Sequence, residues 1–329
     1  MVKESYTTYK GIECLNSCIY NYLKNDGFEI CLSDIFFGGR GLDMRYTGML
    51  SERMLYSYQY KSNFKFINLY LKDSIVDNYV AELYDMKEFL INSVKNNEKI
   101  ILRVSSSNLP YNKVFDKNKI ISHYVNVIDY DLVKDVFIVS DGCVPVNGES
   151  IYQGETAANV LIENWRKMNG EYLILQYNEY MAHSLKKDSY KVFKKQIRNY
   201  IKSKNHILGS RYKGMDCILS LQEDMYLLFE KQSDDLQNIV IDIRRQLNME
   251  GFMQAKYYIY DKMCDICVSD EICKAYEENI CNWNKVIFNF VKAGLKKNME
   301  EYQEVVRFTS KLNEEERKIL SRCQSNYIC

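Results

Sequence analysis

The spacing of hydrophobic residues changes near residue 184, and this change predicts two domains. Before residue 184, short apolar runs typical of β-strands alternate with segments of helical periodicity. After it, five or more segments with helical spacing follow one another with almost no strand signal. The sequence therefore predicts an α/β domain of the α+β type over residues 1–183 and a helical, bundle-like domain over residues 184–329.

The clearest helix of the first domain is predicted at residues 11–26. Its apolar residues recur at helical spacing and form one stripe: Ile12, Leu15, Ile19, Tyr22 and Leu23. Gly27 follows, at the position where a glycine commonly ends a helix. We therefore expect a buried helix whose first turn contains Cys14.

Cys14 is the candidate nucleophile. In the first turn of a helix, unpaired backbone N–H groups and the helix dipole favour a thiolate over a thiol. A small core residue is the alternative explanation for a cysteine at this position. Cys18, one turn later, is a second candidate nucleophile, but it lies inside the helix, where its own backbone N–H is already paired.

Two β-rich runs, residues 121–131 and 135–142, predict an antiparallel hairpin with a short connection between them. In this register His123 faces roughly residue 143, so Asp141 lies diagonally across from it. A carboxylate there can accept the imidazole N–H and leave the other ring nitrogen to deprotonate a thiol. Cys14, His123 and Asp141 therefore form a candidate catalytic triad in the papain-type order.

A structural role is the alternative for each of these residues alone. A single histidine on a strand is more often a structural hydrogen-bonding group, and an acidic residue before a glycine is common in turns. Their occurrence together, at strand positions that pair, favours the triad. His183 and His206 lie in or near the helical half without a cysteine in a comparable setting, so we assign them no role.

The N-terminal region resembles a known family, the butirosin-biosynthesis-H-type N-terminal domain, in four segments. These segments are residues 13–27, 36–42, 122–131 and 139–142. The family has a papain-like cysteine fold related to the bacteriocin-processing peptidases of ABC exporters. The resemblance implies the same fold over slightly more than half of this chain, with Cys14, His123 and Asp141 as the residues that carry the chemistry.

The resemblance also implies an activity. Members of this family are acyltransferases that move an acyl chain from the phosphopantetheine thioester of a carrier protein to an amine. We therefore expect a Cys14 acyl-enzyme, an acyl or peptidyl carrier protein as partner, and a small-molecule amine acceptor, with amide-bond formation in the biosynthesis of a peptide-like natural product. We expect no cofactor or metal of its own, since the thioester already stores the activation energy. The helical domain would position the substrate or the carrier.

Two departures from the family pattern affect this hypothesis. The family usually has a histidine directly before the cysteine, where this chain has Glu13. Papain-like peptidases carry an oxyanion-binding glutamine about six residues before the cysteine, where this chain has Thr8. The oxyanion would then depend on the backbone N–H of Cys14 and a second donor, Thr8 or Asn16.

The missing glutamine weakens the hypothesis of a peptidase more than that of an acyltransferase, because a thioester is easier to attack than an amide. A cysteine peptidase or amidohydrolase with the same triad remains the first alternative, and a catalytically inactive carrier-binding module the second. We also expect an ion pair between Cys14 and His123, which would lower the thiol pKa well below its free value of about 8.5.

The second half of the chain carries a cluster of candidate metal ligands: Cys264, Cys267, Cys273 and Cys281. The segment is predicted to be helical throughout, which would hold the last two cysteines away from the first two. We therefore predict no metal site and interpret these residues as small buried side chains.

Gly38, Gly39 and Gly41 predict a tight loop with positive φ, beside an active-site cleft. The surrounding sequence does not favour a nucleotide site, since no strand precedes the glycines and no Lys-Ser or Lys-Thr pair follows them.

Charge and hydropathy exclude other classes of protein. Lys+Arg and Asp+Glu are balanced at 44 each, so no net field would attract nucleic acid or an acidic membrane. No run reaches the roughly 18 apolar residues of a transmembrane helix, and the N-terminus has no signal-peptide core. We therefore expect a cytoplasmic protein whose eleven cysteines are reduced thiols.

Overall fold

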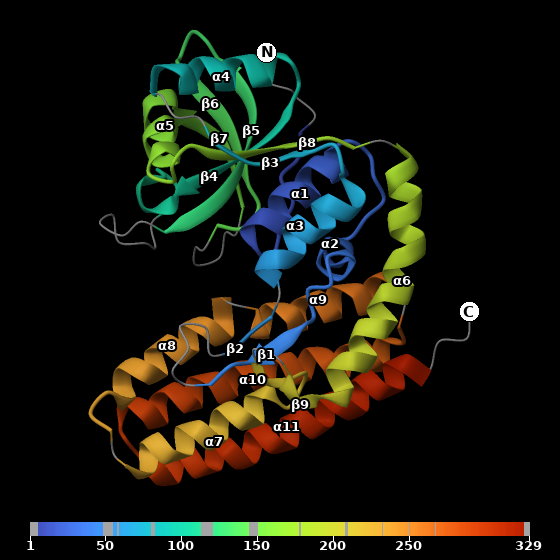
Figure 1. The fold of residues 1–329 in the computed structure, drawn as a ribbon, viewed down its shortest axis with the longest axis vertical. Helices are drawn as coiled ribbons and strands as arrows, with labels where there is room; N and C mark the ends of the chain where they lie inside the picture. The colour runs from blue at the N-terminus through green and yellow to red at the C-terminus, as the bar shows by residue number, and fades with distance from the viewer. Residues whose placement is uncertain are drawn as a thin grey trace. The chain divides into compact units, whose positions relative to one another are not determined.

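The computed structural model describes residues 6–48, 55–57, 59–79, 83–112, 121–144, 151–177, 179–207, 210–231, 233–249, 251–266 and 268–325. The chain forms two compact units (Figure 1). The first unit comprises Met1–Ile35 and Asn63–Lys186, and the second comprises Phe36–Ser62 and Lys187–Cys329. Helices combined with antiparallel sheets place the chain in the α+β class.

The first unit is built on a six-stranded antiparallel sheet with the strand order β3-β8-β4-β5-β6-β7. Its strands are β3 (Ile75–Tyr79), β4 (Lys99–Ser105), β5 (Ser122–Asp131), β6 (Val136–Asp141), β7 (Tyr152–Ala157) and β8 (Glu171–Leu175). Its helices are α1 (Cys14–Asn25), α3 (Gln59–Tyr70), α4 (Leu83–Lys95), the short 3₁₀ helix η1 (Ser106–Asn108) and α5 (Ala158–Arg166).

Helices cover both faces of this sheet (Figure 1). On one face, α4 and α5 bury Leu90 and Trp165 against apolar residues of β4, β5 and β6. On the other face, α1 and α3 bury Ile19 and Phe66 against Ile101 and residues of β8. Because the sheet is apolar on both sides, most of β4 is buried, and β5 is buried at His123 and over residues 125–128, which fixes the position of the side chains there.

The predicted hairpin is confirmed. β5 and β6 pair antiparallel with Val127 opposite Val139 and Asn126 opposite Ser140, and one register shift lies between Val127 and Asp129. The edge strands β3 and β7 were missed by the sequence analysis. In β7, most side chains are exposed or half-buried, so its sequence lacks the apolar alternation from which strands are predicted.

The second unit combines a small antiparallel sheet with long helices. The sheet has the order β2-β1-β10-β9 and consists of β1 (Met44–Tyr46), β2 (Leu55–Ser57), β9 (Lys204–Ile207) and β10 (Ser210–Lys213). The helices are α2 (Leu32–Gly38), α6 (Glu179–Lys202), α7 (Cys217–Glu230), α8 (Leu236–Met249), α9 (Phe252–Asp265), α10 (Asp270–Leu295) and α11 (Met299–Ser325). The chain passes between the units within α2, α3 and α6.

The small sheet explains why residues 36–62 belong to the second unit, although the sequence analysis assigned them to the first domain. Arg45 of β1 pairs with Lys213 of β10, far along the chain. The strands that the sequence analysis missed here are three or four residues long, too short for a periodic signal. The other predicted boundary, at 183/184, lies close to the division at Lys186.

The glycine loop serves close packing. A side chain on Gly39 would lie 1.9 Å from the carbonyl oxygen of Ser62, and one on Gly41 would lie 2.4 Å from the ring of Phe36. The positive φ predicted for these glycines occurs instead at Arg40, with φ of 62°. The loop lies in the second unit, so its glycines are explained by contacts within that unit.

A buried ion pair joins α9 to α11. The ammonium of Lys256 lies 2.5 Å from the carboxylate of Glu316, and both side chains are at most 1% exposed. Tyr276 and the indole of Trp283 also donate hydrogen bonds to Glu316. Burial lowers the pKa of Lys256, while the charge of Glu316 opposes that change.

We expect Glu316→Gln to lower the free energy of unfolding of the second unit by about 3–5 kcal/mol, because it leaves the Lys256 ammonium buried without its counter-charge. Denaturant unfolding followed by circular dichroism measures this change. The matched control is Glu271→Gln, since Glu271 forms an exposed pair with Arg322 between the helices α10 and α11. The control should change stability by less than about 1 kcal/mol. Equal effects of the two substitutions would contradict the expectation.

Within the described ranges, no helix combines the length and the apolar character that crossing a bilayer requires.

Candidate active site

Helix α1 begins at Cys14, so Cys14 lies in its first turn as predicted, and Glu13 caps it. The carboxylate of Glu13 accepts hydrogen bonds from the backbone N–H groups of Leu15 (3.1 Å) and Asn16 (2.9 Å). Asn63 of α3 donates a further bond to the same carboxylate at 3.1 Å. The helix ends as predicted, with Gly27 at a φ of 85° just beyond it. The position of Cys14 is therefore set by a capping residue that carries negative charge.

Cys14 is half-buried, and its sulfur lies 3.4 Å from a carboxylate oxygen of Glu13, to which the S–H donates. Burial raises the pKa of the thiol well above its ordinary value, and the charges of Glu13 and Cys143 add to the rise. A hydrogen bond from the backbone of Tyr124 acts in the opposite direction. The site therefore holds Cys14 as a neutral thiol.

His123 and Asp141 form a buried pair in the predicted hairpin. The Nε2 atom of His123 lies 2.6 Å from Oδ2 of Asp141, and the two side chains are 9% and 1% exposed. The other carboxylate oxygen of Asp141 accepts the backbone N–H of Cys143 at 2.9 Å. Burial alone would lower the pKa of His123, but Asp141 and, after it, Glu13 raise it above the ordinary value. This pairing leaves Nδ1 as the ring atom available to accept a proton.

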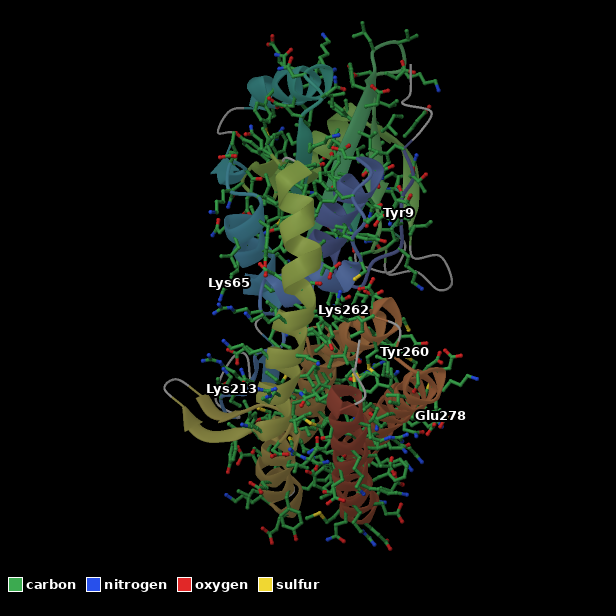
Figure 2. The ribbon with its side chains drawn as sticks, turned by 90° about the vertical axis from the view of Figure 1, so that its right-hand side faces the viewer. Tyr9, Lys65, Lys213, Tyr260, Lys262 and Glu278 are labelled. Carbon is green, nitrogen blue, oxygen red and sulfur yellow. The ribbon has the colours of Figure 1, made fainter. Side chains whose placement is uncertain are left out.

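The end of β6 is attached to the segment that leads into α1. The backbone N–H of Gly11 donates to the carbonyl of Gly142 at 2.7 Å. Tyr9, labelled in Figure 2, lies on the same segment and exchanges hydrogen bonds with the side-chain amide of Asn21 in α1. A side chain on Gly142 would lie 2.5 Å from the carbonyl oxygen of Tyr9, so only glycine fits there. These contacts hold the start of α1 against the strand end that carries Asp141.

The structure therefore brings the three predicted residues into one region of the first unit, but without the expected ion pair. The side-chain amide of Asn126 on β5 donates to the carbonyl of Cys18 on α1 at 3.0 Å, so the helix that begins at Cys14 packs on the strand that carries His123. In the part of the chain that the structure describes, no hydrogen bond joins the Cys14 sulfur directly to His123. The expected depression of the thiol pKa was wrong, because burial disfavours the thiolate and Glu13, which binds the helix N-terminal donors, adds its charge beside the sulfur.

Of the two candidate oxyanion donors, Thr8 already donates its hydroxyl elsewhere and Asn16 is buried. Thr8 is buried, and its hydroxyl donates to the side chain of Gln153 at 2.7 Å while it contacts the Ser140 hydroxyl at 2.7 Å. The side chain of Asn16 is fully buried, and its backbone N–H is bound by Glu13. The backbone N–H of Cys14 has no acceptor among the residues described, so it is the donor that remains for an oxyanion.

Three residues at the site were not singled out from the sequence. Tyr111 donates to Asp141 at 3.3 Å, and burial, followed by the charge of Asp141, raises its pKa. Burial, followed by the charge of Glu13, raises the pKa of the Cys143 thiol to about 12. Gly142 makes the close contact described above. The glycine after Asp141 was the one available sequence signal, since a strand that ends in Asp-Gly commonly leads into a tight turn.

The cysteine cluster of the second unit is divided between two helices, whereas the sequence predicted one continuous helix for this segment. Cys264 lies near the end of α9, whereas Cys273 and Cys281 lie on α10. The side chains of Cys264 and Cys273 interact, and burial, followed by this interaction, raises the pKa of Cys273 to about 11. Cys267 lies outside the described residues. Among those described, these cysteines do not bring three ligand atoms together, and the absence of a metal stays a prediction.

We expect the alkylation rate of Cys14 to be low at neutral pH and to rise as the pH increases, because the raised pKa keeps the thiolate scarce until alkaline pH. Iodoacetamide labelling followed by peptide mass spectrometry measures this profile, with the exposed Cys264 and Cys281 as internal references. Rapid labelling of Cys14 at mildly acidic pH would instead indicate a thiolate–imidazolium pair.

No family model matches this chain, and no curated protein matches its sequence. Among solved structures, the chain is similar to a Bacillus anthracis protein described as a C39-like peptidase. The two share 11% sequence identity with a TM-score of 0.37, and the match covers 54% of this chain and 97% of that protein.

Proposed function

We propose that this chain is a cysteine-dependent acyltransferase with a papain-like first unit. It takes an acyl chain from the phosphopantetheine thioester of an acyl or peptidyl carrier protein and transfers it to an amine, in the biosynthesis of a peptide-like natural product. Cys14 is the nucleophile, His123 the base, and Asp141 the residue that orients the base. The observation that carries the proposal is the buried His123–Asp141 pair, on a hairpin whose strand β5 is hydrogen-bonded to α1 through the Asn126 side chain and the carbonyl of Cys18.

Acylation begins from a neutral thiol. Nε2 of His123 is bound to Asp141, so Nδ1 accepts the proton of Cys14 as the sulfur attacks the thioester carbon. The new S–C bond replaces the bond from the acyl carbon to the phosphopantetheine sulfur. The departing pantetheine thiolate takes the proton back from His123. The raised pKa of His123 strengthens it as a base, which suits a thiol whose own pKa is raised.

Amide formation regenerates the thiol. The amine forms a C–N bond to the acyl carbon, the C–S bond to Cys14 breaks, and His123 moves the proton from nitrogen to sulfur. The backbone N–H of Cys14 supports the oxyanion in both steps. Asp141 stabilises the imidazolium that forms between them.

The sparse set of oxyanion donors favours thioester chemistry over peptide cleavage. Glu13 binds the N–H groups of Leu15 and Asn16, and the Thr8 hydroxyl donates to Gln153. Losing one oxyanion donor slows acyl transfer from an amide by about 10²–10³-fold. A thioester is activated already and requires less of this support. No resident cofactor or metal takes part in the proposed reaction.

The proposal assigns the second unit to positioning the substrate or the carrier protein, and places the reaction in the cytoplasm. The cysteines that the structure describes carry free thiols, which suits a reducing compartment.

Intact-mass analysis tests the proposal. The protein is incubated with S-acetyl-N-acetylcysteamine, a mimic of the pantetheine arm, and with acyl-loaded carrier protein, each with and without ethylamine. We expect an acyl adduct on Cys14 that disappears as N-ethylamide forms. Cleavage of a peptide through the same residues would indicate a peptidase. Carrier binding with no adduct on Cys14 would indicate an inactive carrier-binding module.

A further inference from the structure

Glu13 occupies an unusual position for a capping residue, because one of its hydrogen-bond donors is the candidate nucleophile. Its Oε1 atom accepts the backbone N–H of Leu15 and the S–H of Cys14, at 3.1 and 3.4 Å. Its Oε2 atom accepts the backbone N–H of Asn16 and the side-chain amide of Asn63, at 2.9 and 3.1 Å. Two donors on each oxygen satisfy the carboxylate in the resting protein.

Acylation changes this arrangement at one point. The backbone and amide donors persist through the reaction, but the S–H disappears when the sulfur of Cys14 becomes part of a thioester. Oε1 then has an acceptor position without a donor, next to the sulfur that carries the acyl group. A new hydrogen-bond donor at such a position stabilises a half-buried carboxylate, and a cationic donor stabilises it more than a neutral one.

We propose that Glu13 is the amine-binding residue of the acyl-enzyme, and that the acceptor substrate is a primary ammonium whose N–H replaces the Cys14 S–H at Oε1. This inference rests on the proposed function. It makes substrate binding ordered, because the amine site opens only when Cys14 is acylated. It also favours a cationic amine over water, since water brings no charge to Glu13.

The ammonium gives one proton to His123, and its nitrogen forms a bond to the acyl carbon of the Cys14 thioester. The C–S bond breaks as the tetrahedral intermediate collapses. His123 passes its proton to the Cys14 sulfur, and the nitrogen loses its second proton to solvent. The products are the amide, the Cys14 thiol and one free proton, and the restored S–H returns to Oε1 of Glu13.

Glu13→Gln and Glu13→Ser test this role. Both remove the charge, and serine is among the favoured capping residues, so at least one variant should retain the start of α1. Glu13→Asp keeps both the charge and a favoured cap. Asp26→Asn is the matched control, because it removes a carboxylate at the other end of the same helix. The acyl donor is S-acetyl-N-acetylcysteamine, and the acceptors are ethylamine, a cation at neutral pH, and hydroxylamine, which is neutral there.

The acylation rate of Cys14 is measured separately in each variant, so that a change in the first step is not mistaken for a change in amine binding. The KM of the uncharged variants for ethylamine should rise about tenfold or more, with a much smaller change for hydroxylamine. Asp26→Asn should stay close to the wild type. Glu13→Asp keeps the charge, so its KM for ethylamine should lie between those of the wild type and the uncharged variants. An unchanged ethylamine KM, or equal changes for both acceptors, would overturn the role of Glu13 alone. A wild-type protein that forms no Cys14 adduct would overturn the proposed function, and this inference with it.

Discussion

Cys14→Ala should eliminate the acyl-enzyme and lower the rate of amide formation by about 10⁴-fold or more, the scale on which loss of a covalent nucleophile acts. The substitution removes the sulfur whose S–H donates to the Glu13 carboxylate. The fold should persist, because Cys14 is half-buried at a helix start and alanine is a good helix former. Intact mass reports the adduct, and chromatography of the amide product reports the rate.

Cys18→Ala is the matched control for this experiment. Cys18 lies one helical turn after Cys14 and is 2% exposed, and burial raises the pKa of its thiol well above the ordinary value. We expect the Cys18 variant to retain most of the activity and to lose some stability, because a small cavity replaces the sulfur. The reverse result, with an active Cys14 variant and an inactive Cys18 variant, would move the nucleophile to Cys18.

His123→Ala should lower the acylation rate by about 10³–10⁴-fold, and Asp141→Asn by somewhat less, because the first removes the base and the second only its orientation and charge. The distinguishing measurement is the pH profile of acylation. His123 acts as a base in its neutral form, so acylation should rise with pH through the raised pKa of His123. Asp141→Asn removes a charge and a hydrogen bond that raise this pKa, so the rise should move to lower pH.

Tyr111→Phe serves as the control for the Asp141 variant. It removes the 3.3 Å hydrogen bond to Asp141 but leaves the 2.6 Å bond between Asp141 and His123. Its pH profile should therefore stay close to that of the wild type. If the profile of Asp141→Asn also stayed in place, the hairpin would hold His123 for structural reasons and the triad hypothesis would fail.

The sequence predicted those parts of the site that local patterns determine. Helix α1 follows from its apolar stripe and its terminal glycine, and the hairpin register follows from two strands with a short connection. The effect of Glu13 on the pKa of the Cys14 thiol could not be predicted from the sequence, although the departure of Glu13 from the family pattern was visible there. One of its hydrogen bonds comes from Asn63, which lies on another helix fifty residues away. A capping carboxylate beside a cysteine raises the thiol pKa, whereas an uncapped helix start would lower it.

The difference between features set by local sequence and features set by distant partners also explains the errors in the predicted fold. Strands β4, β5 and β6 are rich in buried Val and Ile, so their sequence is distinctive. Strands β1 and β10 are three and four residues long and exist because they pair with each other. Pairing with a strand so distant in the chain does not produce a local periodicity of hydrophobic residues. The assignment of residues 36–62 to the first domain failed for this reason.

The discontinuous second unit has a consequence for protein synthesis. A ribosome releases residues 36–62 early, but their partner strand β10 and helices α7 to α11 emerge only after the whole first unit has been made. Synthesis proceeds at about 5–20 residues per second, so the edge of β1 that pairs with β10 stays unpaired for many seconds. An unpaired strand edge promotes aggregation. A chain that stops near residue 180 never leaves that unpaired state. Active first-unit fragments will therefore require replacement of residues 36–62 by a short linker, rather than truncation at the C-terminal side alone.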